Sequence, residues 1–331
     1  MITKISVEKA LELDNKIFVD VRSPKEFEED HLPKAISVPV LDNEERAIVG
    51  TLYKQVSREE AIKEGEKFYE ARIPLISEAI KPHKGKTLVV YCWRGGMRSK
   101  IMATLFETLK FKVYQLEGGY KSYRKHVIER ISSYKLKPKL IVLHGLTCSG
   151  KTQLLQLFSN SIDLEGLAQH RGSLYGGLGL KQNSQKMFEN LLLLELDRLN
   201  KEKFVFVEGE SRRIGNLIIP ELFWKSMKKG MNVLITRSLD IRAKECVKEY
   251  FTPENIEKIK EITESLQKVI SNKNKQKIIE FINNKNYEEA AKILLVEYYD
   301  KLYGFSLNKI EYDLEVSNDD LGEAEERLKD I

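Results

Sequence analysis

Residues 88–99 read Leu-Val-Val-Tyr-Cys-Trp-Arg-Gly-Gly-Met-Arg-Ser, and this stretch decides the fold of the first part of the chain. The run over 88–91 is apolar, as in a buried β-strand, and it ends at Cys92. A loop rich in glycine and arginine follows, and Ser99 is expected to open an amphipathic helix over 100–109. A strand, a loop and a helix in this order point backbone N–H groups at the sulfur, which favours the thiolate.

The loop after Cys92 also carries Arg94 and Arg98. Two guanidinium groups beside a thiolate would hold an anionic donor close to the sulfur. The simpler alternative is a buried and inert cysteine at the end of a strand. Two glycines and two arginines within the next six residues favour the reactive alternative. We therefore interpret Cys92 as a nucleophile or group carrier.

Composition points to two packed domains, because the chain has 331 residues of which 42% are hydrophobic and 32% charged. The first residues contain no apolar leader segment, and no later run is long enough to span a bilayer. The three cysteines are widely separated and odd in number, which fits neither a disulfide framework nor a zinc site. These features predict a cytoplasmic protein without membrane contact.

The first 125 residues alternate short apolar runs with helical patterns. Strands are expected over 16–21, 86–91 and 112–116, and a helix over 59–80. This alternation predicts a parallel α/β domain over residues 1–125, with its site at the carboxyl ends of the strands.

A basic run follows, in which residues 121–139 hold seven Lys and Arg against the single acid Glu129. We expect a basic linker over 126–138. Such a run is either a solvated connection or a contact for the phosphate backbone of a nucleic acid.

The second predicted domain, residues 139–331, begins with an apolar strand over 139–144 and the sequence Gly-Leu-Thr-Cys-Ser-Gly-Lys-Thr. This G-x4-G-K-T pattern between a strand and a helix is typical of the P-loop. The loop is expected to bind phosphate or diphosphate groups, and Thr152 is a possible ligand of Mg²⁺. Cys148 inside the loop is interpreted as a tolerated small residue. The predicted phosphate-binding residues are Gly145, Ser149, Gly150, Lys151 and Thr152.

Further polar residues follow strands of this domain. Glu208 ends a strand over 204–207, where P-loop enzymes place an acid that orients Mg²⁺ or water, although it would equally serve as a helix cap. Glu210, Arg212 and Arg213 lie on the following loop, and the arginines suit either phosphate groups or surface ion pairs. His170 and Arg171 lie in a polar, glycine-rich segment of the composition found in functional loops.

Residues 241–302 are helical in pattern, and we expect a helical subdomain there. Its lysines form either a solvated face or a lid or RNA-docking surface. A final strand is expected over 308–316 and an acidic helix over 319–329. The lysines are Lys258, Lys260, Lys268, Lys273, Lys275 and Lys277.

The first domain resembles the rhodanese family. The resemblance rests on Asp20-Val-Arg-Ser-Pro-Lys-Glu-Phe27, His31-Leu-Pro33, the Cys92 loop and Glu117-Gly-Gly119. In that family the loop cysteine carries sulfur or selenium as a persulfide-type adduct. Arg98 stands six positions after Cys92, one more than in the usual rhodanese loop, and this resembles the Cys-x5-Arg cradle of phosphatases. The longer loop would suit a tetrahedral anion such as selenophosphate.

The whole chain resembles the bacterial tRNA 2-selenouridine synthases. The matching segments are residues 50–54, 91–99, 145–152, 170–173 and 210–215, although this family usually has glycine where Cys148 stands. The resemblance implies a transferase that replaces sulfur by selenium at the wobble 2-thiouridine of tRNAs for Lys, Glu and Gln. Selenophosphate is the donor, and geranyl diphosphate yields an S-geranyl intermediate. It implies these two co-substrates, no tightly bound cofactor, and an enzyme that supplies selenophosphate as partner.

On this basis we expect Cys92, Arg94 and Arg98 to handle selenium, and the P-loop to hold a diphosphate or a nucleotide. The basic linker and the helical subdomain would meet the anticodon arm. Two alternatives stay open: a sulfurtransferase or phosphatase, and a P-loop kinase or RNA-binding NTPase with a regulatory rhodanese module. Expected substrate or tRNA contacts are Trp93, His170, Arg171, Glu208, Glu210, Arg212 and Arg213.

Overall fold

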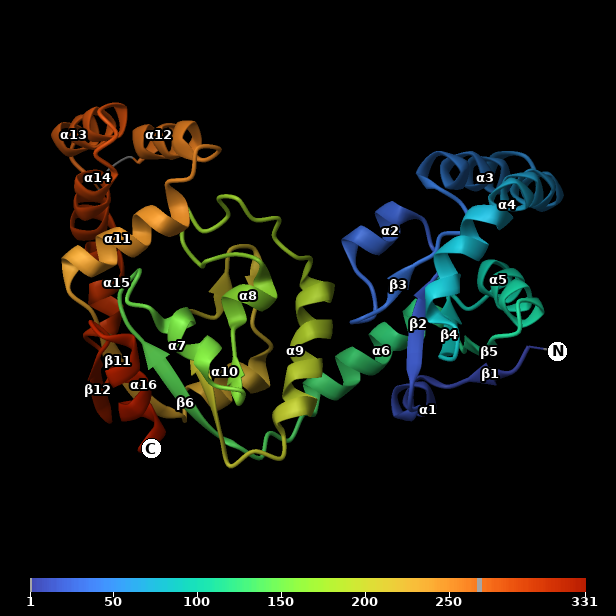
Figure 1. Ribbon diagram of the computed structural model, residues 1–331, viewed down its shortest axis with the longest axis horizontal. Coiled ribbons are helices and arrows are strands. Elements are labelled where there is room, and N and C mark those ends of the chain that lie inside the picture. Colours follow the sequence, from blue (N-terminus) through green and yellow to red (C-terminus); the bar gives the residue numbers. More distant parts are fainter. Residues whose placement is uncertain (1, 267–269) are drawn as a thin grey trace. The chain divides into compact units, whose positions relative to one another are not determined.

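A computed structural model describes residues 2–266 and 270–331 of the chain. The chain forms two compact units, which we call the first and the second domain. The first domain contains residues 1–133 and 189–194, and the second contains residues 134–188 and 195–331. Each has a parallel sheet with helices around it, which is the mixed α/β class predicted (Figure 1).

The first domain is built on a five-stranded parallel sheet in the order β1-β5-β4-β2-β3. β4 lies in the middle, and four of its five residues are buried. This burial explains why its sequence is an almost uninterrupted apolar run. Because all strands are parallel, the ends of β2, β4 and β5 meet at one edge of the sheet. The strands are β1 (Lys4–Ile5), β2 (Lys16–Asp20), β3 (Ile36–Ser37), β4 (Thr87–Tyr91) and β5 (Lys112–Leu116).

Helices pack around this sheet: α5 contacts β4 and β5, α6 contacts β5, and α3 packs on α4. The core contains the buried side chains of Val19, Leu88, Val90, Met102 and Phe106, from β2, β4 and α5. The helices of this domain are α1 (Val7–Glu12), α2 (Pro24–Glu29), α3 (Asn43–Gln55), α4 (Arg58–Ile80), α5 (Met97–Thr108) and α6 (Gly119–Ser132).

Two predicted boundaries in this domain are wrong. The helix after Cys92 begins at Met97 and not at Ser99, so Arg98 lies in its first turn. The expected linker over 126–138 is helical up to Ser132, where α6 ends. Val127 and Ile131, four residues apart, are both buried, and this apolar stripe holds the basic segment in a helix.

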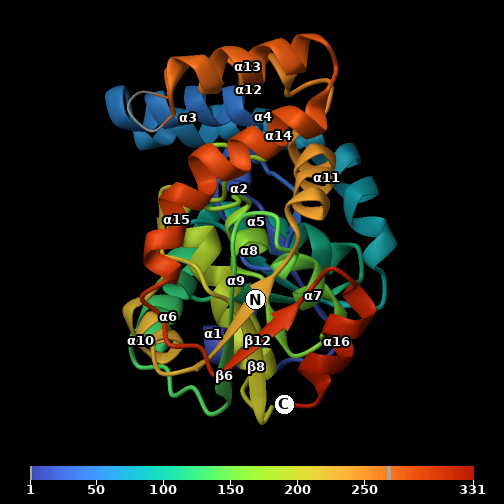
Figure 2. The same cartoon turned by 90° about the vertical axis from the view of Figure 1, so that its left-hand side faces the viewer.

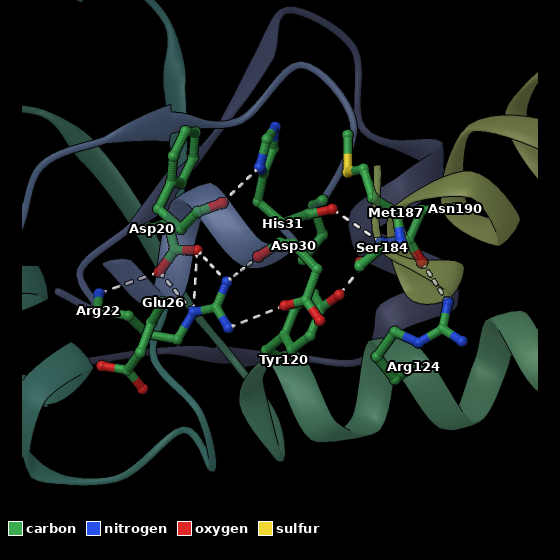
Figure 3. Close-up of polar contacts among 12 residues, drawn as sticks. Asp20, Arg22, Glu26, Asp30, His31, Tyr120, Arg124, Ser184, Met187 and Asn190 are labelled. Carbon is green, nitrogen blue, oxygen red and sulfur yellow. Dashed lines mark hydrogen bonds and ion pairs between the residues drawn. The ribbon is translucent and has the colours of Figure 1, made fainter. Parts of the chain in front are cut away.

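A buried arginine, Arg22, connects the end of β2 with the end of α2. Arg22 is only 1% exposed, and its guanidinium donates to the carboxylate of Asp20 and to the backbone oxygen of Asp30, at 2.6 Å each (Figure 3). Its guanidinium carbon also lies 4.2 Å from the ring centre of Tyr120. A charge buried this deeply is tolerated only because each of its faces has a partner.

Residues 189–194, which belong to α9 (Gln185–Leu199), pack with the first domain. The amide of Asn190 donates to the backbone oxygen of His31 at 2.8 Å and to the hydroxyl of Tyr120 at 3.2 Å. Its side-chain oxygen accepts from the guanidinium of Arg124 (Figure 3). Asn190 is fully buried and uses both ends of its amide, so it fixes this segment against α6.

The second domain contains a five-stranded parallel sheet in the order β12-β11-β6-β8-β7, with β6 in the middle. A short antiparallel hairpin of β9 and β10 follows β8. The last strand covers Leu314–Ser317 and so begins six residues later than the expected 308. The strands are β6 (Lys139–His144), β7 (Ser161–Ile162), β8 (Phe204–Glu208), β9 (Arg213–Ile214), β10 (Leu217–Ile218), β11 (Met231–Thr236) and β12 (Leu314–Ser317).

The helices of the second domain fall into two groups. Those around the sheet are α7 (Lys151–Leu157), α8 (Leu164–Ala168), α9, α10 (Glu221–Met227) and α16 (Leu321–Lys329). The expected helical subdomain consists of α11 (Leu239–Tyr250), α12 (Ile256–Ser265), α13 (Asn272–Asn283), α14 (Tyr287–Leu294), a π-helical turn (Leu295–Tyr299) and α15 (Asp300–Leu307).

The helical subdomain has its own apolar core, which includes Tyr250, Ile278, Leu294 and Tyr299. Its helices α12–α14 lie at the end of the domain away from α16 and the C-terminus (Figures 1 and 2). Lys268, one of the lysines expected on this subdomain, lies outside the described residues.

We predict that Arg22→Met destabilises the first domain by about 3–5 kcal/mol, because it leaves the buried Asp20 carboxylate without the guanidinium that is bound to it. Urea unfolding of the full chain would be followed by Trp93 fluorescence in a Trp224→Phe background. These are the two tryptophans of the chain, so the signal then reports on the first domain.

The matched control is Lys67→Met, which removes an ion pair with Glu64 from a lysine that is 63% exposed. This variant should lose less than about 1 kcal/mol. Equal losses in the two variants would contradict the role given to Arg22.

Candidate functional site

Cys92 directly follows β4, and its thiol is 97% removed from solvent. The sulfur lies 3.3 Å from the hydroxyl of Ser99 and accepts from the backbone N–H of Gly96, also at 3.3 Å. Both partners come from the loop and first turn of α5, as the strand–loop–helix pattern predicts. The thiol therefore lies between a hydroxyl and a backbone N–H group, both within hydrogen-bond distance.

The loop is held in place by close backbone contacts with the turn before α6. The backbone N–H of Tyr120 donates to the carbonyl of Cys92 at 2.8 Å. A Cβ atom on Gly119 would stand 2.2 Å from the Cys92 carbonyl oxygen and 2.4 Å from the Gly95 nitrogen, so only glycine fits there. Gln115 on β5 also donates to the Gly95 carbonyl at 3.0 Å. These contacts fix the loop around the sulfur.

The pKa of the Cys92 thiol lies below its usual value. Burial raises this pKa, but the Ser99 hydroxyl, the charge of Arg98 and the backbone N–H groups of Ser99 and Gly96 together outweigh burial. Donors and a positive charge stabilise the thiolate more than the neutral thiol. Cys92 is thus better suited to act as a nucleophile than an average buried cysteine.

The two arginines of the loop have different surroundings. The Arg98 guanidinium is partly buried and donates to Glu26 of α2 at 3.0 Å. Arg94 is exposed and has no ion pair within residues 2–266 and 270–331. Arg98 therefore sets the charge beside the sulfur, whereas Arg94 is available to an incoming anion. Trp93 is half-buried, with its ring centre 5.7 Å from that of Tyr120.

In the second domain, the P-loop connects β6 to α7. Gly150 has φ +84°, and a Cβ atom on it would stand 2.2 Å from the Asn318 amide nitrogen. The ammonium of Lys151 donates to the Gly145 carbonyl at 3.0 Å, and Ser149 is buried within the loop. The predicted phosphate-binding residues are thus brought together at the carboxyl end of the central strand, ahead of a helix N-terminus.

Cys148 occupies a left-handed position of the loop, with φ +61°, which accounts for a preference for glycine there. Its thiol is hydrogen-bonded to that of Cys246, and this bond together with burial raises the pKa of Cys148 well above its usual value. At neutral pH Cys148 is therefore a protonated thiol and a poor nucleophile.

Glu208 at the end of β8 contacts both the P-loop and the start of α8. One carboxylate oxygen accepts from the Thr152 hydroxyl at 2.9 Å, and the other accepts from the backbone N–H of Glu165 at 3.0 Å, in the first turn of α8. Burial, followed by the charges of Asp163 and Glu210, raises the pKa of Glu208 to about 8. At neutral pH this side chain is therefore mostly protonated.

A cavity of about 1120 Å³ opens over the P-loop. One part of its wall is polar and includes Lys151, Glu165, Arg171, Glu210 and Arg212. Another part consists of large apolar side chains, with Trp224 and Met227 from α10 and Phe305, Leu307 and Ile310 from α15 and the segment after it.

Of the predicted contacts in the second domain, His170, Glu208 and Arg213 do not line this cavity. His170 accepts at Nδ1 from the backbone N–H of Gly172, and Arg213 is exposed on β9. Arg212 does line the cavity. Its guanidinium lies 4.0 Å from the Glu221 carboxylate, which is the longest distance that still counts as an ion pair.

Sequence reasoning did not find His144, Asp163, Glu165, Trp224 and Phe305, all of which line the cavity. His144 directly precedes the P-loop, so its position beside this motif is a signal that could have identified it. Asp163 follows a strand of only two residues, which carries no periodic signal. Phe305 is brought in by α15, which lies over 150 residues later in the chain.

Comparison with sequence families matches both domains. Residues 3–126 match the rhodanese-like domain, and residues 138–278 match the tRNA 2-selenouridine synthase AAA domain. The chain is 33% identical over 327 residues to a tRNA 2-selenouridine synthase of Nitrosomonas europaea, covering 94% of this chain and 83% of that protein. The chain belongs to the tRNA 2-selenouridine synthase family.

Two further members of the tRNA 2-selenouridine synthase family show the same relation. The chain is 31% identical over 332 residues to one from Hydrogenovibrio crunogenus, covering 90% of this chain and 91% of that protein. It is 37% identical over 236 residues to one from Nitrosomonas eutropha, covering 68% and 60%. The resemblance and the fold class drawn from the sequence are thereby confirmed. Within the described residues, no helix combines the length and apolarity needed to cross a membrane.

We predict that Arg98→Met slows alkylation of Cys92 by iodoacetamide at pH 7 severalfold, because Arg98 is the charge that lowers the pKa of this thiol. The matched control Arg94→Met removes the exposed arginine of the same loop and should change the rate much less. Peptide mass spectrometry separates Cys92 from the other two cysteines. A larger effect of Arg94→Met would contradict this electrostatic assignment.

We also predict that the free energy of unfolding of the unliganded chain falls as the pH rises from 5 to 8. In this window the folded chain keeps a proton on Glu208, with its pKa of about 8, which the unfolded chain has lost. Glu208→Gln should remove a slope of up to about 1.4 kcal/mol per pH unit. Denaturant titrations at several pH values measure it, with the exposed Glu202→Gln as control. An unchanged slope in Glu208→Gln would contradict the raised pKa.

Proposed function

We propose that this chain is a tRNA-modifying transferase that replaces the sulfur of wobble 2-thiouridine by selenium. The donor is selenophosphate, and the reaction passes through an S-geranyl-2-thiouridine made from geranyl diphosphate. The observation that carries the proposal is the pairing, in one chain of this family, of an activated Cys92 with a P-loop cavity that has a large apolar wall.

The cavity of the second domain suits a prenyl diphosphate, because it has an apolar wall in addition to the P-loop. Backbone N–H groups of the loop and Lys151 would hold the diphosphate. Trp224, Met227, Phe305 and Ile310 offer an apolar surface to the isoprenoid chain, and Phe305 is 71% exposed without a ligand. Covering such side chains is favourable by about 25 cal/mol per Å² of apolar surface.

Mg²⁺ is part of this proposal. The residues fit it, because the Thr152 hydroxyl and the Glu208 carboxylate are hydrogen-bonded to each other and the charges of Asp163 and Glu210 act on Glu208. Within the described residues, no group of three or more His, Cys, Asp and Glu side chains is arranged to hold a metal by itself. The remaining ligands would be water and phosphate oxygens, as Mg²⁺ prefers. When bound, the ion would neutralise charge on the diphosphate.

In the first domain, Cys92 would assist the delivery of selenium from selenophosphate, with the exposed Arg94 binding the phosphate. Selenium forms its bond to C2 of the base as the selenium–phosphorus bond breaks, the geranyl thiolate leaves C2, and water takes up the phosphoryl group as phosphate. Arg98 is engaged by Glu26 and would act mainly on the thiolate. The S-geranyl group supports this step chemically, because a geranyl thiolate leaves carbon C2 of the base more readily than sulfide does.

The tRNA would contact exposed lysines of α6 and of the segment that follows it. Lys121, Lys125, Lys135, Lys137 and Lys139 are exposed, whereas the apolar stripe of α6 is buried. Exposed cations suit a phosphate backbone, and an anticodon loop offers an unstacked base. The tRNAs for Lys, Glu and Gln, a selenophosphate-supplying enzyme and a cytoplasmic location belong to the same proposal.

The test uses 2-thiouridine tRNA, geranyl diphosphate and selenophosphate, with mass spectrometry of the nucleosides formed. Wild type should give both S-geranyl-2-thiouridine and 2-selenouridine. Cys92→Ser should accumulate the S-geranyl nucleoside and give no 2-selenouridine, because it lacks only the thiolate. Lys151→Met should lose at least about 90% of geranylation, since the P-loop lysine neutralises the diphosphate.

The matched control for Lys151→Met is Lys201→Met, an exposed lysine of the same domain, which should behave as wild type. Loss of both products in Cys92→Ser would contradict the division of labour. Rapid hydrolysis of a phosphate ester without tRNA would favour the phosphatase alternative. ATP turnover that persists in Cys92→Ser without any tRNA product would favour the NTPase alternative.

A further inference from the structure

His144 is the last residue of β6 and directly precedes the first glycine of the P-loop. It is 9% exposed, and that exposed part lines the 1120 Å³ cavity together with Gly145–Thr152. The functions assigned above make no use of it. A histidine at this point lies on the same cavity wall as the proposed diphosphate site and has a polar ring, unlike the aliphatic side chains of residues 140–143 before it in β6.

The hydrogen bonds around His144 fix its tautomer. Its Nε2 lies 3.0 Å from the side-chain oxygen of Asn232, and the Asn232 amide nitrogen donates to the backbone oxygen of Glu311 at 3.3 Å. Turning the Asn232 amide over would set its oxygen against the Glu311 oxygen. Nε2 must therefore carry the proton and donate it to Asn232, which leaves Nδ1 as an unprotonated acceptor.

Nδ1 faces the end of β8, where the structure leaves room for it. A Cβ atom on Gly209 would stand 2.3 Å from Nδ1, so any side chain there would collide with this nitrogen. No hydrogen bond to Nδ1 is formed within the described parts of the chain. The ring thus offers a lone pair beside the strand end that carries Glu208 and Glu210.

The charged neighbours of His144 keep its ring neutral. Burial lowers its pKa, the bond to Asn232 opposes this, and Lys151 of α7 and Lys228 after α10 lower it further. The ring of Tyr312 stands edge-on at 5.8 Å, and its own pKa is raised by burial, so it carries no charge at neutral pH. Glu210 and Glu311 also line the cavity. A neutral imidazole with a free lone pair is the form that accepts protons.

We infer that His144 Nδ1 is the proton acceptor for S-prenylation of the thiouracil base. This inference rests on the proposed function, because it assigns a residue to the geranyl transfer. The base loses its N3 proton to Nδ1, and the electron pair of N3 forms the C2=N3 double bond. The sulfur then forms its bond to C1 of the prenyl group while the C1–oxygen bond breaks and diphosphate leaves. The proton passes from the imidazolium to water.

The test compares wild type with His144→Gln in geranylation of 2-thiouridine tRNA between pH 5.5 and 10, with kcat and KM measured for geranyl diphosphate. Glutamine can still donate to Asn232 but has no basic nitrogen. We expect kcat to fall about 10²–10⁴-fold at pH 7, the usual contribution of a general base. KM for geranyl diphosphate should be almost unchanged.

The pH profile separates this role from a structural one. The deficit of His144→Gln should shrink as the pH rises and the base loses its N3 proton without help, whereas a structural defect would persist. Lys228→Met should move the acidic limb of the wild-type profile to higher pH, because Lys228 lowers the pKa of His144. A wild-type rate in His144→Gln, or a deficit independent of pH, would overturn this inference alone. No S-geranyl product from wild type at any pH would overturn the proposed function, and this inference with it.

Discussion

Parallel strand pairing is the constraint on which both candidate sites depend. In each domain the middle strand, β4 or β6, is buried on both faces and ends at the same edge as its neighbours. A chain leaving such a strand must turn sharply into a covering helix, so its first residues present backbone N–H groups. Cys92 stands at the end of β4 and the P-loop at the end of β6. Glycines at 95, 119 and 150 make these turns possible, because their backbones adopt positive φ or touch other backbone atoms.

The two sites differ in their electrostatics, and this difference fits different chemistry. Around Cys92, hydrogen-bond donors and Arg98 outweigh burial and lower the pKa of the thiol. Around the P-loop, burial raises the pKa values of Glu165, Glu208 and Glu210, and neighbouring acids raise those of Glu165 and Glu208 further. The first arrangement stabilises an anion of the protein itself, the Cys92 thiolate. The second holds Glu208 mostly protonated at neutral pH, and a bound cation would favour its ionised form, which suits a site for a diphosphate with Mg²⁺.

Much of this architecture could be predicted from the sequence, because its strongest signals are local. The strands over 112–116 and 139–144 were placed to the residue, and the P-loop and the Cys92 loop are short motifs whose chemistry is carried by adjacent residues. The start of α5 was misplaced because Gly96, and not Ser99, is its N-cap. The linker was misplaced because positive charge hid the apolar stripe of α6. Trp224 and Phe305 reach the cavity from distant helices, and no local pattern shows such a contact.

The central claim is that the two domains carry out successive steps, with the P-loop serving geranylation and Cys92 serving selenation. The most direct measurement supplies tRNA that already contains S-geranyl-2-thiouridine, with selenophosphate and without geranyl diphosphate, to Lys151→Met and to Cys92→Ser. The account predicts that Lys151→Met forms 2-selenouridine at close to the wild-type rate and that Cys92→Ser forms none. Failure of Lys151→Met to use this pre-geranylated tRNA, or normal product from Cys92→Ser, would contradict it.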